Sequence, residues 1–205
     1  MQLIDSHAHL DFSDFEADLD LVIARAGEAG VFKIVNIGAD LARSKKAIDI
    51  AEKYEQIWAT VGIHPEDCDI DPSVAGEEIR KLTNSSKKVI AIGECGLDYF
   101  YDETKKTKQK ELFKTQIKIA KELKLPIVIH IRNGGDDTAV SDVYQILKEN
   151  QIQKGVIHCF TLEKIWAEKF LGLGLHLGFT GIVTYKNADL VQESAKIVPV
   201  EKILI

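Results

Sequence analysis

The stretch VIAIGECGLDY (89–99) is an apolar run that ends at Glu94, with a glycine on each side of the Glu94-Cys95 pair. Other short apolar runs end in the same way, but at a histidine. They are LIDSHAHL (3–10) with His7 and His9, VGIHP (61–65) with His64, PIVIHIR (126–132) with His130, and GVIHCF (155–160) with His158. Donors that recur at one strand end after another predict a parallel α/β barrel that gathers them at one mouth, where this fold places its chemistry.

Strands and helices are expected to alternate along the whole chain. β-branched and apolar runs predict strands at 3–7, 31–37, 57–62, 89–93, 127–131, 155–158, 175–179 and 202–205. Apolar residues at helical spacing predict helices at 15–29, 41–54, 73–83, 105–123, 140–150, 162–171 and 189–197. Such βαβ units either close into a barrel or lie as an open doubly wound sheet. We expect a TIM-type (β/α)8 barrel that lacks its last helix, because no helix follows the eighth strand.

Length and composition favour a single domain that spans residues 1–205. The chain has 205 residues, of which 45% are apolar, which is at the lean end for a barrel that typically needs about 250 residues. The formal net charge of −6 excludes a long basic nucleic-acid footprint. Three cysteines form no disulfide framework, and no signal peptide or membrane span is visible, so a cytoplasmic protein without membrane contact is expected. No obligate protein partner is evident.

His7 and His9 are two residues apart, so on a strand both imidazoles point the same way and can bind one ion. A lone His-x-His pair is a weak signal, and an isolated Glu94 would more often form an ordinary ion pair. His130 and His158 would each, taken alone, more often be packed core residues. Together the five donors suffice for two metal sites that share the Glu94 carboxylate and leave positions for water and substrate. Mixed nitrogen and oxygen donors leave the identity of the metal open.

His64 and Arg132 are expected at the same rim, where they would contact the substrate. Pro65 forces an extended turn after His64, and a solvent-exposed turn histidine is nearly as good an interpretation. Arg132 lies two residues after His130, so its guanidinium could bind a phosphate or carboxylate with two hydrogen bonds, or pair with Glu94 or Asp98.

Several neighbouring polar residues are candidates for orienting the imidazoles, with helix capping or loop polarity as the alternative role. They are Asp5, Asp11, Asp98 and Tyr99. By alternation, Cys95 and Cys159 should point away from the mouth and pack, and His176 is expected to be structural or exposed.

These motifs resemble the TatD family of metal-dependent deoxyribonucleases, within the wider amidohydrolase-like barrels. The resemblance runs in order through DSHAHLD, VGIHPE, IGECGLDY, PIVIHIR, GVIHCF and GFTGIVTYK. It implies that His7, His9, Glu94, His130 and His158 bind one or two ions of Mg, Mn or Zn, with Glu94 as the bridging carboxylate. It also implies a catalytic position near the scissile phosphate for His64, and hydrolysis of DNA from 3′ ends on single strands.

The C-terminus departs from the family pattern. The resemblance implies an aspartate in a segment like Glu-Thr-Asp after the eighth strand, whereas this sequence reads EKILI at 201–205. We therefore expect a chain that lacks the C-terminal part, with activation of water impaired. Asp189 lies in the wrong segment to replace this aspartate.

Two alternatives to a nuclease remain open. One is an amidohydrolase or lactonase that acts on a small molecule. Many of these barrels use a lysine at the end of the fourth strand, where this chain has Glu94, which favours the nuclease class. The other is a catalytically impaired metal-binding fragment.

Overall fold

Eight parallel strands form one sheet in the computed structural model, which describes residues 2–205. The strands are β1 (Leu3–Ala8), β2 (Val31–Asn36), β3 (Ile57–Val61), β4 (Val89–Asp98), β5 (Ile127–Arg132), β6 (Gly155–Ile157), β7 (His176–Gly178) and β8 (Ile203–Leu204). Each strand pairs in parallel with the next one along the chain. The predicted TIM-type barrel is therefore confirmed.

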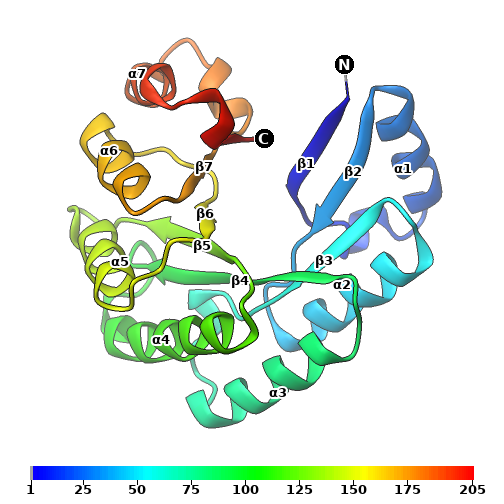
Figure 1. Cartoon of the computed structure of the whole chain (residues 1–205), viewed down its shortest axis with the longest axis horizontal. Coiled ribbons are helices and arrows are strands. Elements are labelled where there is room, and N and C mark those ends of the chain that lie inside the picture. The colour runs from blue at the N-terminus through cyan, green and yellow to red at the C-terminus, as the bar shows by residue number, and fades with distance from the viewer. Residues whose placement is uncertain (1) are drawn as a thin grey trace.

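Seven α-helices connect the strands and cover the outside of the sheet (Figure 1). They are α1 (Leu19–Glu28), α2 (Leu41–Lys53), α3 (Pro72–Asn84), α4 (Lys106–Leu123), α5 (Thr138–Glu149), α6 (Lys164–Gly172) and α7 (Asp189–Ile197). Within residues 2–205, no helix follows β8. None of the helices in this range has the length and apolar character needed to cross a lipid bilayer.

The barrel is nearly closed. The Ser6 amide donates a hydrogen bond to the carbonyl of Ile205 at 2.7 Å, which joins the end of β8 to β1. Among the described residues no paired ladder connects these two strands. Figure 1 shows the C-terminus and β1 on either side of this seam.

Capping aspartates begin two of the helices near the mouth. The Asp40 carboxylate accepts a hydrogen bond from the Arg43 amide at 2.7 Å, and the Asp71 carboxylate accepts one from the Ser73 amide at 2.8 Å. Pro72 is the first residue of α3, where its missing amide hydrogen leaves no bond unmade. Short polar residues that satisfy the free amides of the first turn thus fix where these helices begin.

Apolar side chains fill the space on both sides of the sheet. A small cluster of Ala91, Val128, Val156 and Leu204 lies on one side, and a much larger cluster packs between the other side and the helices. Ile127, Ile129 and Ile157 belong to the larger cluster, so neighbouring positions alternate between the two. The barrel interior is therefore lined by small residues, and each buried aliphatic side chain of the outer layer contributes about 1.5–3 kcal/mol.

This alternation carries two histidines into the barrel. His130 is two residues after Val128 and His158 is two residues after Val156, so each continues the inward-facing row of its strand. In each strand the valine is the last apolar residue of this row, and the histidine is the next residue in it. The sequence pattern of an apolar run followed by histidine thus places the ring at the mouth of the barrel.

β4 contains one extra residue that turns Glu94 inward. Ile92 pairs with Ile127, but the next pair is Cys95 with Ile129, so three residues of β4 match two of β5. This bulge shifts the alternation, which places Cys95 in the outer cluster and Glu94 on the inner side. The prediction that β4 ends at residue 93 was wrong, because the strand resumes pairing with β5 beyond the bulge and continues to Asp98.

The start of the first helix also differs from the prediction. The apolar spacing placed the helix at 15–29, but α1 begins at Leu19, and Ser13–Phe15 forms a separate 3-10 turn. The segment between β1 and α1 therefore lies at the mouth as an irregular loop, which carries Phe12.

Candidate metal centre

Five imidazoles surround the Glu94 carboxylate, which is 3% exposed. The Oε2 atom of Glu94 lies 3.3 Å from Nε2 of His7 and 3.6 Å from Nε2 of His9. The Oε1 atom lies 2.6 Å from Nε2 of His158, 3.0 Å from Nδ1 of His130 and 3.7 Å from Nε2 of His64. The structure thus brings together all six donors that the sequence placed at strand ends.

Five of the six donors form two overlapping groups of the size that holds an ion, and His9 belongs to neither group. His7, Glu94 and His158 offer ligand atoms within 4.8 Å of one another, and so do His64, Glu94 and His130. Glu94 belongs to both groups, with one carboxylate oxygen turned toward the β1 histidines and the other toward the remaining three. His64, expected beside the substrate, lies within the second group, so its position fits either contact with substrate or a place in a metal shell.

The nitrogen atoms approach one another in a way that suits a cation between them. Nε2 of His7 lies 3.3 Å from Nε2 of His9, and Nε2 of His158 lies 3.4 Å from Nδ1 of His130. The His7 and His158 rings stack at 3.9 Å between centroids. Imidazole nitrogens that converge at this distance around one carboxylate match the donor chemistry of first-row divalent ions.

Burial keeps two of these imidazoles neutral. Removal from water lowers the pKa of His7 to about 4, despite its hydrogen bond with Glu94, and it lowers the pKa of His64 to about 4 as well. Burial would raise the pKa of Glu94, but hydrogen bonds from His130, His158 and His7 hold it well below its usual value. The Glu94 carboxylate is therefore ionised and the His7 and His64 rings are neutral, which is the protonation state that metal ligands require.

His130 differs because two carboxylates hold it. Burial opposes its charged form, but the hydrogen bonds to Asp98 and Glu94 prevail and raise its pKa to about 9. Its Nε2 lies 2.9 Å from Oδ2 of Asp98, while Nδ1 faces Glu94. Asp98 thus fixes the ring orientation and the tautomer, as a carboxylate behind a ligating histidine does.

We expect Asp98→Asn to weaken the binding of a divalent ion by about 10–100-fold, because the amide cannot accept the Nε2 hydrogen of His130 in the same way. The substitution keeps an oxygen for the Phe100 amide, which donates to Oδ1 of Asp98 at 3.0 Å. Titration calorimetry with Zn²⁺ or Mn²⁺ measures the change. Asp136→Asn, which alters an exposed turn bonded only to Thr138, is the matched control and should bind the ion as the parent does.

The aspartates beside the His7-Ala8-His9 motif differ in what they contact. Asp5 accepts a hydrogen bond from the His7 amide at 3.0 Å. Asp11 is 5% exposed and its Oδ2 atom accepts from Nε of Arg43 at 2.6 Å. The other oxygen of Asp11 has no hydrogen-bond partner and lies 4.0 Å from Nδ1 of His9. Nδ1 of His9 instead accepts a hydrogen bond from the Arg43 guanidinium at 3.2 Å, so Asp11 orients the His9 ring through Arg43, and Nε2 is the nitrogen that faces Glu94.

Glycines let the strands approach closely around Glu94. A Cβ atom on Gly62 would lie 2.4 Å from Cα of Gly93, and a Cβ on Gly93 would lie 2.4 Å from the carbonyl oxygen of Val128. Gly93 has φ of +127°, a conformation that other residues rarely adopt. Because neither glycine carries a Cβ atom, the backbones can approach, and the Glu94 amide donates a hydrogen bond to the carbonyl of Gly38 at 2.8 Å.

Two buried glutamines on α4 hold the strand ends, and the sequence analysis missed them. Gln109 bonds both the amide and the carbonyl of Asp98, at 2.8 and 2.7 Å. Gln116 does the same for Ile63, the residue before His64, at 2.9 and 2.8 Å. The only signal in the sequence was their spacing of seven residues, two helical turns, which places both on one face of α4.

Gln116→Met should destabilise the fold by about 2 kcal/mol, because methionine has a similar volume but leaves the amide and carbonyl of buried Ile63 without partners. Urea denaturation followed by circular dichroism measures the loss. Gln145→Met removes only a hydrogen bond to Glu149 on the surface of α5 and should change the unfolding free energy by less than about 0.5 kcal/mol. Equal midpoints for the two variants would contradict the bracing role of Gln116.

The other predicted residues lie outside the two groups. The guanidinium of Arg132 lies over Phe100, 3.9 Å from the ring centroid. Burial raises the pKa of Asp98, but hydrogen bonds from His130 and the Phe100 amide, with a smaller effect of the Arg132 charge, lower it below its usual value. Tyr99 points away and donates to Asp142 at 2.9 Å. His176, at the start of β7, belongs to neither candidate group.

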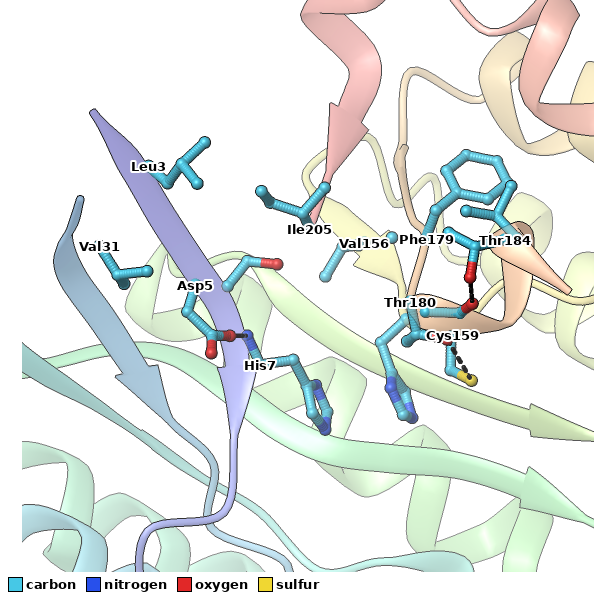
Figure 2. Close-up of a pocket in the computed structure, with 15 residues that line it drawn as sticks. Leu3, Asp5, His7, Val31, Val156, Cys159, Phe179, Thr180, Thr184 and Ile205 are labelled. Atoms are coloured by element: carbon cyan, nitrogen blue, oxygen red, sulfur yellow. Dashed lines mark hydrogen bonds between the residues drawn. The ribbon is translucent and has the colours of Figure 1, made fainter. Parts of the chain in front are cut away.

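A cavity of about 490 Å³ opens beside this centre, along the seam between β1 and β6 to β8. His7 and Cys159 lie at its edge in Figure 2, while Leu3, Val31, Val156 and Ile205 form an apolar wall. Cys95 packs in the core as expected, whereas Cys159 borders this cavity and lies 3.9 Å from Thr180 Oγ1. His7 and His158 can therefore be reached from the side of β1.

Comparison with known proteins now places this centre in a family. Residues 4–205 match the sequence profile of the family described as TatD related DNase. The chain belongs to the TatD family. The family resemblance of the motifs is thus confirmed over nearly the entire chain.

Several curated proteins are similar in sequence to this chain over 99–100% of its length. An uncharacterized metal-dependent hydrolase of Bacillus subtilis, YabD, is 40% identical over 99% of this chain and 78% of its own length. YcfH of Escherichia coli, also named an uncharacterized metal-dependent hydrolase, is 35% identical over 100% of this chain and 76% of its own. The 3′-5′ ssDNA/RNA exonuclease TatD of Shigella flexneri is 32% identical over 99% and 77%. Two of these relatives are thus named metal-dependent hydrolases, and the third is named an exonuclease.

Solved structures of the TatD type have the same fold. The crystal structure of YjjV, a TatD homologue from E. coli K12, superposes with a TM-score of 0.91 at 30% identity and covers 99% of this chain and 77% of that one. A TatD-like protein from Archaeoglobus fulgidus, at 20% identity and a TM-score of 0.64, shares the fold. This chain thus has the same fold as these two solved proteins.

Proposed function

We propose that this TatD-family hydrolase cleaves phosphodiester bonds of DNA, as a 3′-5′ exonuclease on single strands. The observation that carries the proposal is the convergence of five imidazoles on the buried Glu94 carboxylate. The name of one relative, a 3′-5′ ssDNA/RNA exonuclease, supports nucleic acid as the substrate.

In this proposal His7, His9, Glu94, His130 and His158 hold one or two divalent ions, with Glu94 between the two positions. When bound, the ions polarise a phosphoryl oxygen and lower the pKa of a coordinated water. The residues of the chain orient the reactants. His64 contacts the scissile phosphate or completes the second group, and Arg132 contributes positive charge at the rim.

The donor set favours particular ions. Imidazole nitrogen suits zinc and other first-row divalent ions, whereas magnesium prefers oxygen ligands. With five imidazoles against one shared carboxylate, Zn fits this centre better than Mg. Elemental analysis of the purified protein identifies the ion and its stoichiometry.

The test is a substrate comparison with the metal content known. Under the proposal, the metal-loaded protein releases mononucleotides from the 3′ end of single-stranded DNA, loses this activity in EDTA, and leaves amide and lactone substrates intact. Turnover of an amide or lactone alone would favour a small-molecule hydrolase. Stoichiometric metal without turnover of any substrate would favour an impaired metal-binding protein.

We also propose a reducing, cytoplasmic location. Cys68, Cys95 and Cys159 are all free thiols in the structure, and burial raises the pKa of Cys95 well above its usual value. Such thiols suit a compartment where disulfides do not form. Fractionation of cells that express the untagged protein tests the location.

A further inference from the structure

Two groups of exposed aromatic side chains lie at the mouth of the barrel, each in contact with an arginine. The first, here called the β1 shelf, consists of Phe12 and Arg43. The second, the β4 shelf, consists of Phe100, Tyr101 and Arg132. Both lie on segments that follow the carboxyl ends of their strands, which is the side of the barrel that carries Glu94.

The β1 shelf is built directly onto a candidate ligand. The Phe12 ring is 44% exposed and lies nearly parallel to the His9 ring, with 5.1 Å between centroids and 10° between planes. The Arg43 guanidinium lies 4.4 Å from the Phe12 centroid and 3.2 Å from Nδ1 of His9. Arg43 is fixed in turn by its 2.6 Å bond to Asp11. This ring is held in place although nearly half of it faces solvent.

The β4 shelf is more open. Phe100 and Tyr101 are 54% and 65% exposed, and their rings are perpendicular, with 5.0 Å between centroids. The Arg132 guanidinium lies over both, 3.9 Å from the Phe100 centroid and 4.7 Å from that of Tyr101. Exposed aromatic rings ordered by a stacked arginine present flat faces of the kind on which nucleobases stack.

Contacts connect the two shelves to different oxygens of the Glu94 carboxylate. Phe12 contacts His9, which faces Oε2 of Glu94. The Phe100 amide bonds Asp98, which holds His130 on the side of Oε1. A phosphate held by ions beside Glu94 would therefore have one shelf on the side of each carboxylate oxygen, where the flanking bases of a strand would lie.

Charge near the β4 shelf argues against recognition through a long run of phosphates. Lys105 and Lys108 at the start of α4 both pair with Asp69, at 2.6 and 2.7 Å, and Lys110 pairs with Asp142 at 2.6 Å. The net charge of the chain is −6. Because these lysines are paired with carboxylates, they offer little charge for phosphates away from the centre, and base stacking can supply affinity there.

We propose that the β1 and β4 shelves stack with the bases on either side of the phosphodiester at Glu94, so that the enzyme recognises a short single-stranded segment through its bases. This inference rests on the proposed function. Each stacked base is worth about 1–3 kcal/mol, or about 5–150-fold in affinity. Unpaired bases are needed for such stacking, which explains a preference for single strands over duplex.

Binding, measured without hydrolysis, tests the shelves. Fluorescence anisotropy on the metal-loaded protein compares a 5′-labelled single-stranded decathymidylate, with phosphorothioate linkages at its 3′ end that slow hydrolysis, with the same oligonucleotide whose two 3′-terminal nucleotides are abasic. The parent protein should bind the complete strand at least about 10-fold more tightly. Phe12→Leu, and Phe100→Leu combined with Tyr101→Leu, keep apolar volume but remove the flat rings, so each should lose most of this difference. Phe100→Trp in a Tyr101→Leu background should restore it.

Phe32→Leu is the matched control. Phe32 is a 39% exposed ring with Lys33 5.6 Å from its centroid, near the amino end of β2 and thus at the opposite end of the barrel. This variant should bind both oligonucleotides as the parent does. Equal affinity of the parent for the two strands, no binding of either, or equal behaviour of the shelf variants and Phe32→Leu would overturn the inference. Hydrolysis of both strands with no discrimination between them would leave the proposed function standing while the shelves fail.

Discussion

Glu94→Gln should lower the rate of phosphodiester hydrolysis by more than about 100-fold, while the protein stays folded. Loss of a residue that only orients a metal ligand lowers metal affinity or activity by about 10–100-fold. Glu94 should matter more, because its carboxylate lies within 3.7 Å of all five imidazoles of the centre. Glutamine has the same shape, but its neutral amide supplies one weak oxygen donor where the carboxylate supplied two charged ones. Release of nucleotides from single-stranded DNA measures the rate, and elemental analysis of the same sample should show less bound metal.

The control for this change is Glu168→Gln on α6. Glu168 is a surface residue, with its carboxylate 3.8 Å from the ammonium of Lys164, so its substitution should alter neither rate nor metal content. If Glu94→Gln hydrolysed DNA at the parental rate with full metal content, the assignment of the centre would be wrong.

Gly96→Ala should lower the free energy of unfolding by about 4 kcal/mol or more, a loss that few single substitutions cause. Gly96 has φ of +147°, and a Cβ atom there would lie 2.0 Å from the carbonyl oxygen of His130. That oxygen belongs to the neighbouring strand, with which Gly96 pairs, so it cannot move aside without breaking the sheet next to a candidate ligand. Thermal and urea unfolding measure the loss. If the variant is too unstable to fold, it should be recovered as insoluble protein.

The same substitution at Gly27 should have the opposite sign. Gly27 lies near the end of α1, and a Cβ atom there meets nothing within 4 Å. Alanine has the higher helix propensity and restricts the unfolded chain, so Gly27→Ala should raise the unfolding free energy by about 0.5–1 kcal/mol. Similar effects of the two substitutions would show that crowding at Gly96 is not what requires glycine there.

The barrel and its donors could be predicted from sequence because both follow from short-range patterns. Apolar runs that alternate with helical spacing specify parallel strands, and parallel strands bring their carboxyl ends together. His130 and His158 follow inward-facing valines by two residues, so the position of each ring follows from alternation alone. The inward turn of Glu94, in contrast, depends on the bulge where β4 pairs with β5.

Other features depend on contacts between distant segments, which a single sequence does not show. The extension of β4 to Asp98 arises from pairing with β5 beyond a bulge. Gln109 and Gln116 brace residues 11 and 53 positions away. Arg132 was expected to reach a substrate or a carboxylate, but its guanidinium stacks on rings whose positions are fixed by the loop after β4.

The seam between β8 and β1 gives ion binding a second consequence. Only the bond between Ser6 and Ile205 joins these strands among the described residues, yet β1 carries His7 and His9. An ion shared by His7, Glu94 and His158 would cross-link β1 to β4 and to the end of β6. A bound ion would therefore raise the melting temperature and slow amide exchange in β1. The same ion that the reaction needs would then also hold the barrel closed at its weakest junction.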